Sequence, residues 1–257
     1  MRKTKIIAIG GGSVYVPCQP ATTLAIDEEA VRLAAAELPI GRSTVNILFI
    51  PTASRDDIDY CHSIYTHFGL RLGCNYDHLR LIADMNTRQN IEDKIAWADI
   101  IYVGGGNTRY MMREWDKRGV SDLLRVAYAE GKVLMGLSAG SICWFGAGLS
   151  DSNKFDAGSG EDWEPMWVTG LGLVPLLHSP HFDSEAWRRR ELAYNMAEGR
   201  LSKPVLALED NCAIEVVGNE YRILISRPWR RAYLYRNGNR LRLHPTSNFQ
   251  PLESLMT

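Results

Sequence analysis

The sequence Gly-Leu-Ser-Ala-Gly at positions 136–140 has the residue types and the spacing of a nucleophile elbow. It directly overlaps the end of the apolar run Val133–Leu137, so the serine stands where a buried strand turns into a helix. The amide of Ala139, at the head of that helix, would point toward the oxygen of a reacting carbonyl. A serine that only caps the helix could occur in the same motif, but the preceding strand favours Ser138 as a nucleophile.

Three glycines, an asparagine and a threonine at positions 104–108 follow another apolar run, Ile100–Val103. Loops after the carboxyl ends of parallel strands build the ligand crevice, and glycine lets the backbone come close to a ligand. A phosphate-binding loop is the competing interpretation. However, neither this run nor Gly10–Gly12 completes G-x-G-x-x-G, and no Gly-Lys-Ser/Thr follows. We interpret Gly10–Gly12 as a plain turn at a strand end.

A serine nucleophile needs a base, and histidine is the side chain whose pKa lies near neutrality. His178 and His181 lie in a segment that can return to the crevice, the second within Ser-Pro-His-Phe-Asp at 179–183. The other four histidines fall on predicted surface elements or in the C-terminal tail: His62, His67, His78 and His244. A zinc site at His178-x-x-His181 lacks a third ligand at a recognisable spacing.

The elements that must position these residues alternate between strands and helices. Apolar runs without polar alternation, typical of strands buried on both faces, are Ile6–Ile9, Ile47–Ile50, Leu79–Ile82, Ile100–Val103 and Val133–Leu137. Between them lie the predicted helices Asp27–Leu38, Asp57–Phe68, Gln89–Ala96, Thr108–Arg118 and Ser121–Glu130, the last with Ser121 as its cap. This order predicts an α/β fold with an open, mostly parallel sheet and helices on both faces.

The regular alternation of strands and helices ends after position 150. Residues 150–169 indicate a long loop, Ser184–Glu198 a helix, and Val205–Leu208 a further buried strand. Gly218-Asn219 and the segment 236–239 predict two β-hairpins in the C-terminal region. No linker or repeat interrupts the 257 residues, and we expect a single α/β hydrolase domain over 1–257.

The composition is that of an ordinary globular protein. A net charge of -1 gives no basic surface for nucleic acid, and Arg188 to Arg190 are typical of a solvated helix face. No stretch approaches the roughly 20 apolar residues of a membrane span, and Met1–Lys5 precedes a first strand. The five scattered cysteines indicate reduced thiols. We therefore expect a cytoplasmic protein that binds neither nucleic acid nor membrane.

Taken together, the glycine loop, the serine motif with its Ser-Ile-Cys-Trp-Phe continuation, and Pro-His-Phe-Asp with trailing arginines resemble the peptidase E family of serine peptidases, family S51. These are aspartyl dipeptidases, with cyanophycinases as relatives. The similarity runs from the first strand to about Tyr235. It implies a fold similar to class I glutamine amidotransferases, in which serine replaces the amidotransferase cysteine.

The resemblance also implies roles for individual residues. Ser138 matches the family's nucleophile, His181 its general base, and Gly106 and Ala139 the two amides of the oxyanion hole. For the acidic member of the triad we expect Asp151, because the family's acid follows the serine in a short segment similar to Ser-Asp-Ser at 150–152. Some relatives use glutamate. The other candidates are Asp156, Glu161 and Glu164.

The substrate-binding residues implied by the resemblance are Asn107 in the glycine loop, Asp210 for a substrate amino group, and Arg188 for an acidic side chain. Family members carry an arginine after the catalytic histidine that pairs with the substrate's aspartyl group. Here the intervening segment is shorter, and Arg188 to Arg190 match it only loosely. A strict preference for N-terminal aspartate is therefore not implied.

We expect a serine peptidase that hydrolyses short peptides without a metal or a cofactor, as a monomer or a homodimer. The alternatives are a cyanophycinase-like enzyme, an esterase-type serine hydrolase, and a catalytically silent binding module with an amidotransferase-like fold. Esterases of the α/β-hydrolase fold place their histidine nearer the C-terminus than His181, which argues against that class.

Overall fold

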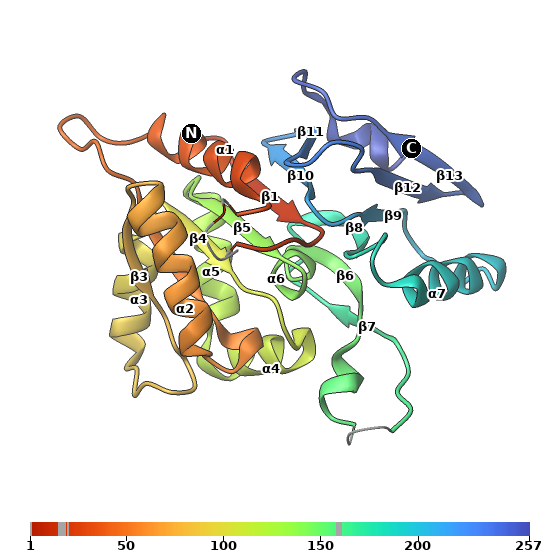
Figure 1. Ribbon diagram of the computed structural model, residues 1–257, viewed down its shortest axis with the longest axis horizontal. Coiled ribbons are helices and arrows are strands. Elements are labelled where there is room, and N and C mark those ends of the chain that lie inside the picture. The colour runs from red at the N-terminus through yellow and green to blue at the C-terminus, as the bar shows by residue number, and fades with distance from the viewer. Residues whose placement is uncertain (1, 15–18, 20, 158–160) are drawn as a thin grey trace.

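The computed structural model describes residues 2–14, 19, 21–157 and 161–257, whose strands form two sheets (Figure 1). The first is eight-stranded, with the order β14-β11-β10-β1-β5-β4-β2-β3. Its strands are β1 (Lys5–Ile9), β2 (Asn46–Ile50), β3 (Asn75–His78), β4 (Ile100–Val103), β5 (Val133–Leu137), β10 (Cys212–Val217), β11 (Glu220–Ile225) and β14 (Gln250–Pro251). The strands β1, β5, β4, β2 and β3 pair in parallel, while β10, β11 and β14 extend the sheet beyond β1 through antiparallel pairs.

Helices cover both faces of this sheet, as the sequence predicted. One face packs against α1 (Leu24–Ala35), α2 (Ile58–Ile64) and the π-helical turns Tyr65–Arg71 that continue α2. The other face packs against α3 (Arg88–Trp97), α4 (Thr108–Arg118) and α5 (Val120–Ala129). Successive residues of β1 alternate between the two cores, because side chains along a strand point to opposite faces.

Six of the strands that follow β5 form a second sheet, with the order β13-β12-β9-β8-β6-β7. They are β6 (Phe145–Ser150), β7 (Met166–Thr169), β8 (Val174–Ser179), β9 (Val205–Leu208), β12 (Ala232–Arg236) and β13 (Asn239–Leu243). The central strands β6, β8 and β9 are parallel. The short helix α6 (Ala139–Ile142) connects β5 to this sheet, and α7 (Ala186–Ala197) packs Leu192 against β9.

Several local predictions are confirmed and others are wrong. Both hairpins form, with turns at Gly218-Asn219 and Asn237-Gly238. The predicted strand Leu79–Ile82 is wrong: the strand is the more polar β3, and Leu79 and Leu81 only bury their side chains after it ends. Ser121 does not cap α5, which begins after Gly119, and its hydroxyl donates to Asp116 instead. The described parts of the predicted loop 150–169 include β7 and a 3₁₀ turn at Ser152–Phe155.

The described cysteines are unpaired, and the described helices are short. Cys61, Cys74, Cys143 and Cys212 are buried free thiols, whereas Cys18 lies outside the described residues. The longest helices, α1 and α7, have 12 residues. Within the ranges given above, the structure contains no helix that is both long and apolar enough to cross a membrane.

Candidate active site

Ser138 lies in a sharp turn between β5 and α6. Its backbone has φ 58° and ψ -115°, a strained conformation that residues with a side chain rarely adopt. A side-chain carbon on Gly140 would overlap the carbonyl of Val103, so the turn can close only because this residue is glycine. The serine is partly exposed although its neighbours Leu137 and Ala139 are buried. This is the geometry of a nucleophile elbow.

Consecutive carbonyls at the carboxyl end of β1 hold Ser138 and His181. The amide of Ser138 donates to the carbonyl of Ile9 over 3.2 Å, and the amide of His181 donates to the carbonyl of Gly10 over 3.1 Å. Two segments 43 positions apart are thus fixed to one strand end. His181, like Ser138, has a positive φ, in this case 49°. Two strained residues at one edge of a sheet indicate a functional site.

The carboxylate that hydrogen-bonds His181 is Asp210, which follows β9. Its Oδ1 lies 2.7 Å from Nδ1 of the imidazole. Burial raises the pKa of the Asp210 carboxyl, but the hydrogen bonds and charge of His181, together with Ser184 and Arg230, outweigh it and hold that pKa below its usual value. An ionised Asp210 can accept the Nδ1 proton, which leaves Nε2 of the imidazole available as a base.

The structure corrects the expectation that Asp151 orients the imidazole. Asp151 follows β6, and Arg188 and Lys154 are the cations beside it; burial raises the pKa of its carboxyl. Of the alternatives, Asp156 pairs with Arg109, while Glu161 and Glu164 are exposed. Asp210 was expected to bind a substrate amino group instead. Its actual position follows from the parallel pairing of β8 with β9, which brings the segments after both strands to the same edge.

The glycine loop lies against the serine. A side-chain carbon on Gly105 would lie 3.3 Å from Cβ of Ser138, and the amide of Gly105 donates to the Tyr60 hydroxyl over 3.4 Å. Gly106 has φ 135°, which a residue with a side chain rarely adopts. Neither the amide of Gly106 nor that of Ala139 has a hydrogen-bond acceptor among the described residues. Within the described residues, both amides thus keep an N–H without a protein acceptor.

Asn107 does not reach the substrate side of this loop. It is 2% exposed, and its Oδ1 accepts the amide of Tyr110 over 2.9 Å as the N-cap of α4. Its Nδ2 donates to the carbonyl of Ser152. The structure thus corrects the expectation of a substrate-binding Asn107, because the side chain is used to begin a helix and to hold the segment after β6.

Arg188 is likewise part of the scaffold. It is 1% exposed, its Nε donates to Glu185 over 2.7 Å, and its guanidinium lies 4.3 Å from the ring centre of Trp187. A further nitrogen donates to the carbonyl of Leu149. The expectation that Arg188 pairs with a substrate carboxylate is therefore not met. Arg189 is also engaged, by the carbonyls of Phe182 and Asp183.

His178 has a structural role. It is fully buried, stacks on Phe145 with ring centres 4.4 Å apart, and donates from Nδ1 to the carbonyl of Leu206. Burial lowers the pKa of His178 to about 3, so the ring is neutral. Its Nε2 lies 2.9 Å from the hydroxyl of Ser141. Within the described ranges, no three side chains of His, Cys, Asp or Glu are grouped as metal ligands.

A hollow of about 450 Å³ lies beside the turn that follows β1. It is lined by Gly12, Asp57, Asp59, Tyr60 and their neighbours. Gly12 follows Gly11, whose backbone lies so close to His181 and Asp210 that any side chain there would overlap both. The hydroxyl of Tyr60 contacts the glycine loop at Gly105. The hollow therefore borders residues that pack against the His181–Asp210 pair and against the glycine loop.

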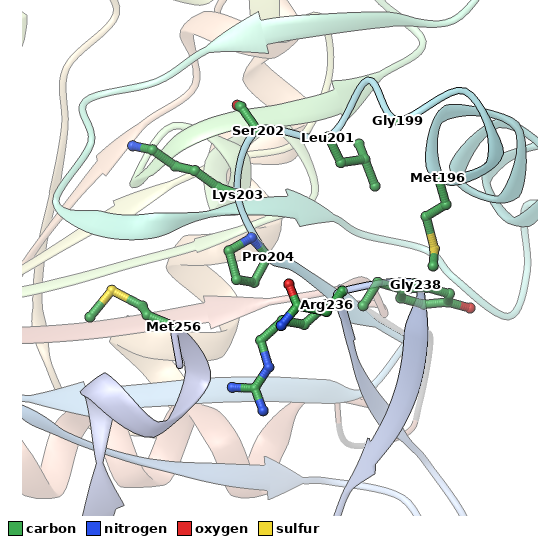
Figure 2. Close-up of a pocket in the computed structure, with 11 residues that line it drawn as sticks. Met196, Gly199, Leu201, Ser202, Lys203, Pro204, Arg236, Gly238 and Met256 are labelled. Atoms are coloured by element: carbon green, nitrogen blue, oxygen red, sulfur yellow. The ribbon is translucent and has the colours of Figure 1, made fainter.

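A separate cavity of about 370 Å³ has a different set of lining residues (Figure 2). Lys203, Pro204, Arg236 and Gly238 are among the residues that line it. It opens where β9 begins, whereas Asp210 follows the other end of that strand. We therefore do not assign it to the reaction.

Taken together, the α/β fold, the strained turn at Ser138 and the hydrogen-bonded His181–Asp210 pair are features expected of a hydrolase. Residues 27–224 match peptidase family S51. The chain is 31% identical over 231 residues to the uncharacterized peptidase YgaJ of Bacillus subtilis strain 168, covering 89% of this chain and 90% of that protein. It is 30% identical over 198 residues to peptidase E of Shewanella amazonensis, covering 72% and 77%. The chain belongs to peptidase family S51 and is a peptidase related to peptidase E.

A solved structure shares the fold. The crystal structure of a peptidase from an acI-B1 Actinobacterium superimposes with a TM-score of 0.71 at 14% identity, covering 97% of each chain. This likeness confirms the α/β architecture across nearly the whole length.

Proposed function

We propose that this peptidase cleaves short peptides by covalent catalysis at Ser138, with His181 as the base and Asp210 as the residue that orients it. The observation that carries the proposal is the 2.7 Å hydrogen bond between Asp210 and Nδ1 of His181, at the strand end that also holds Ser138. This contact selects the imidazole tautomer in which Nε2 can accept a proton.

In the first half of the reaction, Oγ of Ser138 forms a bond to the carbonyl carbon and its proton passes to Nε2 of His181. The oxyanion accepts hydrogen bonds from the amides of Gly106 and Ala139. The C–N bond then breaks, and the imidazolium returns the proton to the leaving amine. In the second half, water attacks the acyl group, again with His181 as base, and restores the Ser138 hydroxyl.

Hydrolysis of an unblocked dipeptide by three proteins tests this proposal: the unaltered chain, Ser138→Ala, and Ser254→Ala as the control. Ser254 is an exposed serine near the C-terminus. We expect Ser138→Ala to lose on the order of 10⁴- to 10⁶-fold in kcat, and the control to lose nothing. Retained turnover in a folded Ser138→Ala protein would contradict a serine mechanism.

A further inference from the structure

We propose that Asp183 is a positioning residue that holds the Asp210 carboxylate against the imidazole of His181. This inference rests on the proposed function. Oδ1 of Asp183 accepts the backbone amide of Asp210 over 2.8 Å, and its other oxygen pairs with the guanidinium of Arg230. The carboxylate thus links the turn that carries the base to the loop that carries its acidic partner.

The need for such a link follows from the backbone around Asp210. The flanking segments are tied down: Phe182 donates to the carbonyl of Leu208 over 3.0 Å, and Asn211 donates to that of Gly11 over 2.7 Å. The amide of Asp210 itself is held by the side chain of Asp183. Asn211 has a positive φ of 60°, so the loop adopts a conformation that the surrounding contacts must maintain.

Arg230 offsets the repulsion between the neighbouring carboxylates of Asp183 and Asp210. A second carboxylate so close to Asp210 would disfavour the ionised form of both, because like charges repel. The Arg230 guanidinium is half-buried beside Asp183, and its charge also helps to lower the pKa of Asp210. Arg189 approaches the same turn, but it donates to the backbone carbonyls of Phe182 and Asp183 and not to the Asp183 carboxylate. Asp183 and Arg230 therefore act as a pair.

The test compares Asp183→Leu, which removes the acceptor, with Asp183→Asn, which keeps it. The readout is labelling by a fluorophosphonate, in which Oγ of Ser138 bonds to phosphorus, fluoride leaves, and His181 takes the proton. A displacement of about 1 Å in a catalytic group can cost 10²-fold, so we expect Asp183→Leu to lower the maximal labelling rate about 10- to 100-fold. Asp183→Asn should stay within about threefold, and the probe concentration at half-maximal rate should be unchanged in both.

A double-mutant cycle separates positioning from a merely structural role. In the Asp210→Asn background, Asp183→Leu should cost less than about twofold more, because a residue that acts through Asp210 has nothing left to position. An equal loss in both backgrounds, or full labelling of Asp183→Leu, would overturn the inference. Asp84→Leu is the matched control, since Asp84 also pairs with an arginine, Arg80, and none of the described site residues hydrogen-bonds to its side chain.

Two further comparisons keep the test decisive. If Asp183→Leu does not fold by circular dichroism, Arg230→Gln serves instead; it should lower the labelling rate several-fold, and an unchanged rate would overturn the inference. Labelling that survives Asp210→Asn at full rate would refute the proposed triad itself. Loss in Asp210→Asn with no loss in a folded Asp183→Leu would refute only the role of Asp183.

Discussion

Replacing Asp210 by asparagine should lower kcat by about three to four orders of magnitude. The carboxylate accepts the Nδ1 proton over 2.7 Å, with both side chains about one-fifth exposed. When His181 becomes charged, it attracts the carboxylate. For charge centres about 4 Å apart, this attraction is worth roughly 4 kcal/mol at an effective dielectric constant near 20. That energy corresponds to about 10³-fold in rate. An amide at this position also favours the wrong tautomer, which raises the expected loss toward about 10⁴-fold.

The effect of Asp210→Asn on kcat is best compared with that of Asp151→Asn. Asp151 is close to Arg188 and is not the residue that hydrogen-bonds His181. The Asp151→Asn variant should therefore keep kcat within about threefold of the unaltered protein. Steady-state hydrolysis of one dipeptide by both variants, with thermal unfolding to verify the fold, provides the comparison. A loss in Asp151→Asn as large as in Asp210→Asn would refute our assignment, as would near-complete activity in Asp210→Asn.

Three further predictions concern substrate, metal and pH. Because Arg188 and Arg189 are engaged within the scaffold, Asp-Leu and Leu-Leu dipeptides should be cleaved at rates within about tenfold, and a much larger preference for Asp-Leu would show that a cation reaches the substrate. Chelator treatment should leave turnover unchanged, and activity that is lost and then restored by zinc would contradict the serine mechanism. The pKa of Asp210 lies below its ordinary value of 3.8, so its interactions stabilise the fold above that pH and are lost as the pH falls through the lower folded-state value. Denaturant unfolding from about pH 5 to pH 2 should therefore show a smaller loss of stability in Asp210→Asn, and an identical loss in both proteins would count against this contribution.

The elements that carry the serine could be predicted because their signals are local. Four of the five apolar runs became β1, β2, β4 and β5, and the helix Thr108–Arg118 has the predicted bounds. Burial on both faces leaves a run of apolar residues that needs no knowledge of the rest of the fold. The turn at Ser138 was predictable for a similar reason, since its small residues and its strand are contiguous in the sequence.

The acid could not be assigned from local signals. Asp210 is 29 positions from His181, and the two meet only because β8 and β9 pair in parallel within a second sheet. The sequence indicated β9 but not β8, so the pairing of these two strands could not be predicted. The carboxylate directly after the buried run Val205–Leu208 was nevertheless a usable signal, because residues at the carboxyl ends of parallel strands gather at one edge.

Two predicted substrate-binding residues were wrong because their polar side chains are buried in the protein. Asn107 caps a helix, and Arg188 is buried with Glu185 and a backbone carbonyl. Both residue types are usually exposed, and in a sequence nothing distinguishes a buried arginine from one that faces a ligand. Burial of these two side chains depends on how the segments after β6 and β8 pack, which only the tertiary structure reveals.

Covalent labelling shows directly whether Ser138 is a nucleophile that His181 activates. The unaltered chain is incubated with a fluorophosphonate, digested, and mapped by mass spectrometry. We predict a single adduct on the peptide that contains Ser138, absent in Ser138→Ala and formed at least about 10³-fold more slowly in His181→Ala. No adduct on a folded protein, or an adduct at Ser138 whose rate is unaffected by His181→Ala, would contradict the account.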